Sequence, residues 1–331
     1  MHQEAYQYIK GHCGWDSVTL LYGEEIPNGE EHRIAHTLLE PPCSGGVEIG
    51  FMYPPEGKEN IRLRVIDFTT RTWLPMCGGM SQVIGLAAFT TSMQEKFKIK
   101  KRLPATLIDV QTDSGLVPIE VNFDGDRISR VTTHMADYAR FLYQDGVRPV
   151  AVRGIPAMKV GYFLVFKMDD LKRAYPDVEF GHRRPGAHME LLGEIQQEYL
   201  REQGIDAATL YGMIYDLHPE DGGDARLFTR FFKGKGVPQS SPMEAQCGTG
   251  TVAVGIAMAE KGELPFSGAR GQIVFEWGSR RLTPDPYGAR KSFLDIKLEK
   301  GRLGWAGFGH NVVELLSVGT VYLPSFEHKL F

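Results

Sequence analysis

The stretch "PMEAQCGTGTVAVGIAM" (residues 242–258) places a thiol directly before a turn of small residues, which leads into an apolar segment. The stretch "PMCGGMSQVIGLAAF" (residues 75–89) has the same arrangement earlier in the chain. In both segments the apolar positions are continuous and polar residues are few, which is typical of a buried helix. The sequence therefore predicts two buried helices, one of them over residues 78–93, that begin directly after Cys77 and Cys247.

Small residues follow each cysteine and set the chemistry of these helix N-termini. The two segments are Cys77-Gly78-Gly79 and Cys247-Gly248-Thr249-Gly250. The first turn of a helix has unpaired backbone N–H groups and a partial positive charge, and glycine lets an anion approach that backbone closely. The same field lowers the pKa of a thiol and makes thiolate accessible near neutral pH.

Two such thiols on either side of a bound carboxylate could invert the neighbouring carbon without a cofactor. One thiolate would remove the α-proton, and the opposite thiol would return a proton to the other face. The helix N-termini would stabilise the charge that develops on the carboxylate. Against this stands the ordinary role of a buried cysteine, which is a small hydrophobic side chain. The presence of two glycine-flanked cysteines favours the catalytic interpretation.

Bulk properties indicate a globular protein and exclude several classes. The 331 residues suffice for two domains. A formal net charge of −4 gives no reason to expect nucleic acid as a partner. No segment approaches the roughly 18 apolar residues of a membrane span, and the amino terminus does not resemble a signal peptide. Four cysteines do not form a disulfide framework. We therefore expect a cytoplasmic protein.

Strands and helices are expected to alternate along the chain. Predicted strands cover residues 17–22, 47–53, 61–74, 161–167, 210–217, 225–232, 272–277, 292–298 and 312–323. Antiparallel strands are expected over 107–134, with a hairpin turn at Asp124-Gly125. Further helices are expected at 30–39 and 187–203, and Asp169 is expected to cap a short helix. The order of strands, cysteine helix and strands occurs twice, which favours a duplicated α/β unit over a doubly wound sheet.

Several segments resemble the proline racemase family, which shares its fold with diaminopimelate epimerase. The segment "QCGTGTVAVGIAMAEKGEL" resembles the second cysteine motif of that family, and "PMCGGMSQVIGLAAF" resembles the first. Weaker similarity is found in "GHCGWDSVTLLYG", "HTLLEPPCSGGVEIGFMYPP" and "GYFLVF". The "CGTGT" motif is fairly specific, and the resemblance covers essentially the whole chain.

The resemblance implies an α/β fold with two pseudo-symmetric domains, each a curled, mostly antiparallel sheet around a central helix. It implies a first domain of residues 1–120 and 310–331 that carries Cys77, and a second of residues 121–309 that carries Cys247. Both cysteines would be acid/base residues in a cleft between the domains. The backbone at Gly78, Gly79, Gly248, Thr249 and Gly250 would hold a substrate carboxylate. No cofactor or metal is implied, and a monomer and a homodimer are both compatible with the sequence.

The chain departs from the family pattern at two positions near the cysteines. Gly79 stands where the family commonly has a histidine, and Met243 stands where proline and hydroxyproline enzymes have an aspartate near the substrate amine. Glu244, one residue along, could replace that aspartate. These departures count against proline or 4-hydroxyproline as the substrate. His12 is expected near the cleft.

Three functions fit this pattern. The first is a racemase or epimerase of an amino acid or a related α-substituted acid. The second is a double-bond isomerase of a di- or tricarboxylic acid, as in the methylaconitate-type branch of the fold. The third is a binding protein for a small acid that has lost catalysis. Each takes a small carboxylate as its partner, without nucleic acid or membrane.

Other motifs carry less chemistry. Residues 247–255 do not match the dinucleotide-binding glycine pattern, because the third glycine comes too late. Two groups of polar residues could be drawn as metal sites, namely His182, His188 and Glu190, and His218 with Glu220, Asp221 and Asp224. Neither group has a recognised ligand spacing, so solvated turns are the preferred interpretation.

Overall fold

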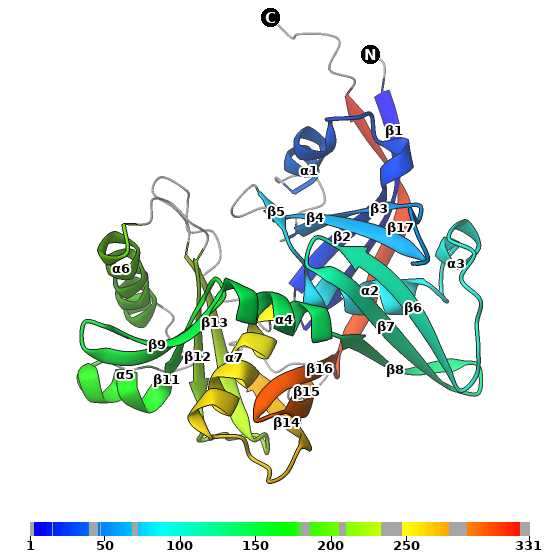
Figure 1. Ribbon diagram of the computed structural model, residues 1–331. Helices are drawn as coiled ribbons and strands as arrows, with labels where there is room; N and C mark the ends of the chain where they lie inside the picture. Colours follow the sequence, from blue (N-terminus) through cyan, green and yellow to red (C-terminus); the bar gives the residue numbers. More distant parts are fainter. Residues whose placement is uncertain are drawn as a thin grey trace, which may run out of the picture.

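Two buried helices form the centres of two sheet units in the computed structural model. The structure describes residues 3–14, 16–39, 46, 48–67, 72–178, 180, 186–204, 210–232, 247–277 and 290–324. Helix α2 (Gly78–Ala87) lies among the strands of the first unit and α7 (Gly248–Lys261) beside those of the second (Figure 1). Nearly every residue of α2, and every residue of α7 up to Met258, is buried. The continuous apolar pattern therefore does reflect burial on all sides of each helix.

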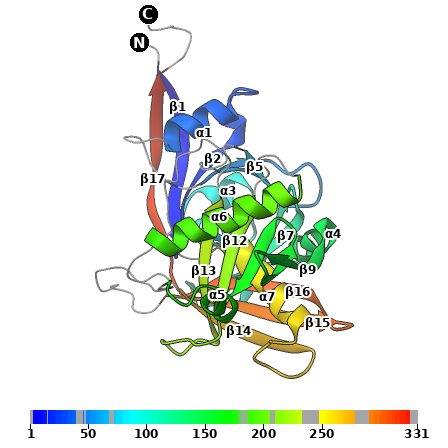
Figure 2. The same ribbon diagram turned by 90° about the vertical axis from the view of Figure 1, so that its left-hand side faces the viewer.

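The first unit combines strands from both ends of the chain. Its strands are β1 (Gln3–Cys13), β2 (Asp16–Tyr22), β3 (Glu48–Tyr53), β4 (Ile61–Asp67), β5 (Trp73–Leu74), β6 (Ala105–Thr112), β7 (Gly115–Asp124), β8 (Arg127–His134) and β17 (Val313–Pro324). The last strand, β17, pairs antiparallel with β1 along nearly its whole length. Figure 2 shows these two strands side by side.

The second unit is built from one continuous part of the chain. Its strands are β9 (Val147–Val152), β10 (Ile155–Val160), β11 (Phe163–Lys167), β12 (Leu210–Asp216), β13 (Ala225–Phe232), β14 (Arg270–Trp277), β15 (Lys291–Glu299) and β16 (Arg302–His310). The hairpin between β9 and β10 turns at Arg153 and Gly154, which both have positive φ. Such backbone suits the tight turn of a two-residue hairpin.

The order of strand pairing is the same in the two units. From β1 through β2, β3, β4, β6 and β7 to β8, the pairings are antiparallel, parallel, antiparallel, parallel, antiparallel and antiparallel. From β10 through β11, β12, β13, β14 and β15 to β16, the same six pairings follow in the same order. Antiparallel strands β17 and β9 lie outside β1 and β10 respectively. The predicted duplicated, mostly antiparallel fold is confirmed.

The two units join through equivalent strands. Strand β16 pairs with β8, with Gly307 opposite His134 and Phe308 opposite Thr133. Pairing in the first unit continues through β7 and β8, so residue 120 lies within a paired strand of that unit. The division of the chain into domains at this residue stays a prediction. This pairing joins the sheets of the two units directly.

Outer helices cover the remaining sheet faces in equivalent places. Helix α1 (Glu31–Leu39), between β2 and β3, packs Ile34 and Leu38 into a core cluster with Phe51. Helix α6 (Gly186–Glu202), between β11 and β12, packs Leu192 and Ile195 into the corresponding cluster of the second unit. The other helical elements are η1 (Gly23–Glu25), α3 (Met93–Lys96), α4 (Ala136–Asp145) and α5 (Met168–Ala174).

Two local predictions were wrong. The helix predicted over 78–93 ends at Ala87, and in the turn that follows the hydroxyls of Thr90 and Thr91 donate to main-chain carbonyls of the last helical turn at 2.8 Å. Asp169 does not cap α5, since that helix begins after Lys167 without a side-chain capping bond. Asp169 lies instead in the first turn, where its charge still suits the positive end of the helix.

Candidate active site

Cys77 is the residue that caps the N-terminus of α2. Its Sγ accepts a hydrogen bond from the backbone N–H of Met80 at 3.1 Å. The hydroxyl of Ser81 donates to the carbonyl of Gly78 at 2.7 Å, which fixes the first turn. An N–H group that points at the sulfur at the positive end of a helix favours the thiolate form.

Cys247 caps α7 in the same manner. Its Sγ accepts from the backbone N–H of Gly250 at 3.3 Å, and the hydroxyl of Thr251 donates to the carbonyl of Cys247 at 2.8 Å. In addition, the Thr249 hydroxyl lies 3.0 Å from Sγ. This hydroxyl can donate to a thiolate or accept from a thiol. Cys247 therefore has one more polar contact than the backbone alone provides.

The two helix N-termini meet backbone to backbone. A Cβ atom on Gly78 would lie 2.7 Å from the Cα of Gly248, and a Cβ on Gly248 would lie 2.8 Å from the Cα of Gly78. Both separations are far below an ordinary contact between carbon atoms. Only glycine fits at both positions, and this contact brings the positive ends of α2 and α7 together.

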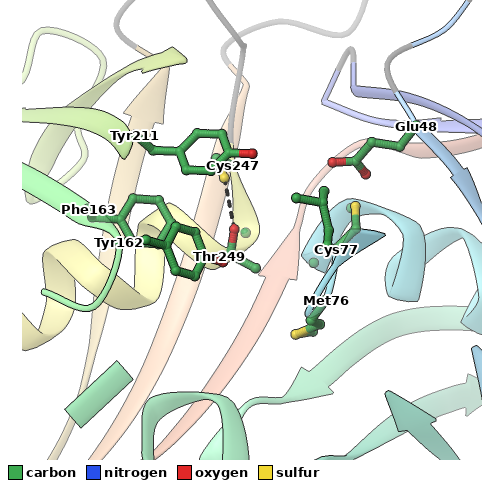
Figure 3. Close-up of a pocket in the computed structure, with 12 residues that line it drawn as sticks. Glu48, Met76, Cys77, Tyr162, Phe163, Tyr211, Cys247 and Thr249 are labelled. Atoms are coloured by element: carbon green, nitrogen blue, oxygen red, sulfur yellow. Dashed lines mark hydrogen bonds between the residues drawn. The ribbon is translucent and has the colours of Figure 1, made fainter. Parts of the chain in front are cut away.

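Both cysteines line one cavity between the two units (Figure 3). Its lining residues are Glu48, Leu74, Met76, Cys77, Gly78, Gly79, Tyr162, Phe163, Tyr211, Cys247, Gly248 and Thr249. The cavity volume is about 20 Å³, which is space for roughly one water molecule. Figure 3 shows the side chains of the first unit on one side of this space and those of the second unit on the other.

Tyrosines form the wall around Cys247. The hydroxyls of Tyr138 and Tyr162 lie 2.6 Å apart, and both side chains bond to Thr249. Burial raises the pKa of Tyr138 and of Tyr162, and the negative charge of a Cys247 thiolate raises each further. Both phenols therefore stay protonated at neutral pH, so that a hydrogen-bonded chain of hydroxyls leads to the sulfur.

A buried carboxylate faces this wall from the first unit. Glu48, the first residue of β3, is 6% exposed, and its carboxylate points toward the hydroxyl of Tyr211 across the cavity (Figure 3). Burial raises the pKa of Tyr211, and the charges of Asp67 and Glu48 contribute to the shift. Asp67 lies directly opposite Glu48 on the neighbouring strand β4. The first unit thus presents negative charge to the tyrosines of the second.

The structure brings most of the predicted site residues to this cavity. Cys77, Gly78, Gly79, Cys247, Gly248 and Thr249 all line it. Gly250 is not among the lining residues, and its N–H group donates to the sulfur of Cys247. His12 lies on β1, and its Nε2 is 2.8 Å from a carboxylate oxygen of Glu314 instead. Met243 and Glu244 lie outside the described residues.

Sequence reasoning missed the residues that complete the cavity. Tyr162 and Phe163 lie in the segment "GYFLVF", which was interpreted only as a strand, and Glu48 lies in a segment interpreted in the same way. A charged residue at the start of an otherwise apolar strand was a usable signal for Glu48. Tyr211 carried no such signal, because aromatic residues are common in buried strands.

The polar residues considered as metal sites lie elsewhere. Backbone N–H groups of Glu220 and Asp221 donate to Glu276, and Asp224 accepts from the N–H of Val274. These bonds hold the loop before β13 against β14. His218 of the second group lies instead with Asp169 and Asp216, and these three residues place ligand-type atoms within 4.8 Å of one another. His182 and the side chains of His188 and Glu190 are not among those described.

Similarity to known proteins is found at the level of structure. No protein-family model matches the sequence, and no curated protein matches it. A hydroxyproline epimerase from Agrobacterium vitis, with bound trans-4-hydroxy-L-proline, has a TM-score of 0.64 and 14% identity over 99% of this chain and 94% of its own. A probable proline racemase from Agrobacterium radiobacter K84, with bound carbonate, has a TM-score of 0.62 and 15% identity over 97% of this chain and 94% of its own.

A third similar structure belongs to a different reaction type. A methylitaconate-delta-isomerase has a TM-score of 0.60 and 12% identity over 99% of this chain and all (100%) of its own. Within the part of the chain that the structure describes, none of the helices has the length and apolar character needed to cross a membrane. At these identities the likeness concerns architecture. The chain has the fold shared by the proline racemases, hydroxyproline epimerases and methylitaconate isomerases to which it is similar.

Proposed function

We propose that this chain is a cofactor-independent isomerase, a racemase or epimerase that inverts the α-carbon of an amino acid or a related acid. Cys77 and Cys247 would be its two acid/base residues. The observation that carries the proposal is that both thiols cap buried helices and line one cavity, one from each unit. The racemases and epimerases of the same fold support this choice of reaction.

The chemistry requires only the groups already described. One cysteine, as thiolate, takes the α-proton and becomes a thiol, while the electron pair of the C–H bond is left on the α-carbon and its carboxylate. The other cysteine, as thiol, gives its proton to the opposite face and becomes the thiolate. Backbone N–H groups at Gly78, Gly79, Gly248 and Thr249 would hold the carboxylate and stabilise its developing charge.

Substrate entry requires movement of the two units. The cavity of about 20 Å³ holds about one water molecule, which is too small for an amino acid. The units must therefore part before binding and close over the substrate afterwards. Closure that excludes water strengthens the dipoles that act on the carboxylate. The carboxylate of the substrate would thus bind between the two helix N-termini, where water is excluded after closure.

The decisive test is incorporation of deuterium from heavy water. The protein should be incubated with D- and L-amino acids and related acids, with NMR detection of deuterium at the α-position and chiral analysis of the product. On the substrate found, Cys77→Ser and Cys247→Ser should each reduce inversion by roughly 100- to 10,000-fold, because each removes one proton carrier. Cys13→Ser is the matched control, since Cys13 is buried on β1 and does not line the cavity.

Two results would contradict the proposal. If both cysteine variants invert the substrate at the rate of the parent protein, the two-thiol mechanism is wrong. If an acid binds tightly but no deuterium enters any acid over a long incubation, the chain is a binding protein that retains only the cavity.

A second candidate reaction is migration of a carbon-carbon double bond. The methylitaconate-delta-isomerase of the same fold covers the whole chain and favours this alternative. The same two proton carriers would remove hydrogen from one carbon of an unsaturated dicarboxylic acid and deliver it to another. NMR detection of a shifted alkene, without inversion of any amino acid, would select this reaction over racemisation.

A further inference from the structure

Glu48 has no part in the proton transfers just described, yet it lines the same cavity. It is 6% exposed, and a carboxylate is seldom buried to this degree without a polar purpose. Glu48 comes from β3 of the first unit and points toward Tyr211 from β12 of the second (Figure 3). Any substrate that binds between the units therefore meets this carboxylate.

Groups of opposite charge line the cavity. The N-termini of α2 and α7 meet at Gly78 and Gly248 and supply partial positive charge. Glu48 supplies negative charge. Burial is the largest cause of the raised pKa of Tyr211 and of Tyr162 in the opposite wall, and the charge of Glu48 adds to it. A molecule with a negative group and a positive group a few bonds apart matches this arrangement.

We infer that Glu48 binds the amino group of the substrate and thereby restricts the proposed isomerase to α-amino acids, an inference that rests on the proposed function. The substrate carboxylate binds at the helix N-termini, and the ammonium group binds Glu48. The rings of Tyr162 and Phe163 line the same space and can face the cation. Charge-assisted hydrogen bonds of this kind are about twice as strong as neutral ones.

Glu48 also selects against the competing substrate classes. A second carboxylate near Glu48 would be repelled in a cavity of low dielectric, which disfavours di- and tricarboxylic acids. An α-hydroxy acid has the same shape as the corresponding amino acid but brings no positive charge to Glu48. The change in the ratio of amino acid to hydroxy acid activity when Glu48 is substituted therefore isolates the contribution of this one residue, because the intrinsic difference between the two substrates is the same for both proteins.

The experiment measures deuterium exchange on matched pairs, such as alanine with lactate and phenylalanine with phenyllactate, together with itaconate as a dicarboxylic acid. For the parent protein, kcat/KM for the preferred amino acid should exceed that for its hydroxy acid by roughly 100-fold or more. Glu48→Gln should reduce that ratio roughly 10- to 100-fold, mainly by raising KM for the amino acid. Glu48→Asp should restore part of the preference.

Glu120→Gln is the matched control, because Glu120 bonds to His134 and Asn122 away from the cavity. It should leave the ratio unchanged. The melting temperature of each variant separates loss of binding from loss of folding. A general structural role of Glu48 would slow exchange of both members of a pair equally, and that result overturns the inference.

Failure of this inference is distinguishable from failure of the proposed function. If the parent protein exchanges hydroxy acids or itaconate in preference to amino acids, and the reaction still requires both cysteines, the inference is wrong and the two-thiol chemistry stands. If amino acids exchange equally well without Cys77 and Cys247, the proposed function is wrong. If none of the acids exchanges, both are wrong.

Discussion

Cys77 and Cys247 occupy equivalent positions in the two units, but their surroundings differ. Each sulfur accepts from a backbone N–H three residues later, and a hydroxyl four residues later bonds to a carbonyl of the same turn. Two residues after the cysteine, however, Thr249 contacts the sulfur in the second unit, where the first unit has Gly79. The capping N–H and the hydroxyl that bonds within the first turn are thus common to the two thiols, and Thr249 distinguishes Cys247.

The walls beside the two thiols differ in the same way. Tyr162, Phe163 and Tyr211 of the second unit surround the side of Cys247, whereas Leu74 and Met76 line the side of Cys77. Tyrosine hydroxyls on the side of the second unit, and Leu74, Met76 and Glu48 on the side of the first, give the two cysteines unequal environments. We therefore expect Cys77 and Cys247 to differ in how readily they transfer a proton.

The largest effect is expected where the two helices touch. Gly78→Ala and Gly248→Ala each place a methyl group within 2.7 or 2.8 Å of the opposite Cα. The helix N-termini must then move apart, which should lower activity by roughly 100-fold and destabilise the fold by about 1–3 kcal/mol. Steady-state kinetics and urea unfolding measure the two effects.

Gly319→Ala is the control for this substitution, because its new methyl group would lie no nearer than 3.5 Å to another heavy atom. Its activity should equal that of the parent protein. Full activity in Gly78→Ala would show that the two helix N-termini need not be in contact for catalysis.

A smaller effect is expected from removal of the hydroxyl that distinguishes Cys247. Thr249→Val should slow proton transfer at Cys247 by about tenfold, because one hydrogen bond to the thiolate is lost. The equilibrium constant between the enantiomers fixes the ratio of kcat/KM in the two directions, so kcat/KM cannot show which cysteine is affected. Kinetic isotope effects can. The α-deuterium kinetic isotope effect should rise for the enantiomer that Cys247 deprotonates, and the solvent deuterium isotope effect should rise for the enantiomer that Cys77 deprotonates.

Thr251→Val provides the comparison for Thr249→Val. Thr251 bonds to the carbonyl of Cys247 rather than to its sulfur, so its loss should affect stability more than isotope effects. Equal isotope effects for both enantiomers in Thr249→Val would mean that the hydroxyl does not distinguish the two thiols.

The smallest effect concerns the point where the chain passes from the second unit back to the first. Burial, with the nearby charge of Arg290, lowers the pKa of His310 to about 3. The unfolded chain protonates this histidine near its usual pKa of 6.5, whereas the folded chain does not. Stability should therefore fall as the pH falls below that value, by about 0.7 kcal/mol between pH 7 and pH 6.

Urea unfolding at the two pH values, for the parent protein and for His310→Asn, measures this term. Asparagine retains an acceptor for the backbone N–H of Val312, which His310 Nδ1 accepts at 2.8 Å. Between pH 7 and pH 6 the free energy of unfolding of the variant should fall by about 0.7 kcal/mol less than that of the parent protein. An identical pH dependence in both proteins would show that His310 titrates alike in the folded and unfolded states.

Much of the architecture followed from local patterns in the sequence. The two cysteine helices were predictable because a small-residue turn and an unbroken apolar run occur together. The hairpin predicted to turn at Asp124-Gly125 is present, with its turn one residue later at Gly125-Asp126, because Asp124 pairs with Arg127. Strands β9 and β10 were missed, since Pro149 and Pro156 interrupt the alternation that marks a strand. Strand β16 was missed because its three glycines weaken the same signal.

The cavity was predictable only in part. Cys77 and Cys247 carried a chemical signature of their own, whereas Glu48 and Tyr211 became neighbours through the tertiary arrangement of β3 and β12. These strands are distant in sequence and belong to different units, so no local pattern relates them. The proton carriers could therefore be proposed from the sequence, while the residue that we expect to select the substrate required the structure.

The partnership of β1 with β17 affects the order in which the protein can fold during synthesis. Strand β1 is made before its partner β17, and all strands of the second unit lie between them in the chain. The second unit, from β9 to β16, is complete in one stretch before that strand is made. This edge of β1 thus stays unpaired until β17 has been made, so the first unit is completed only after the second.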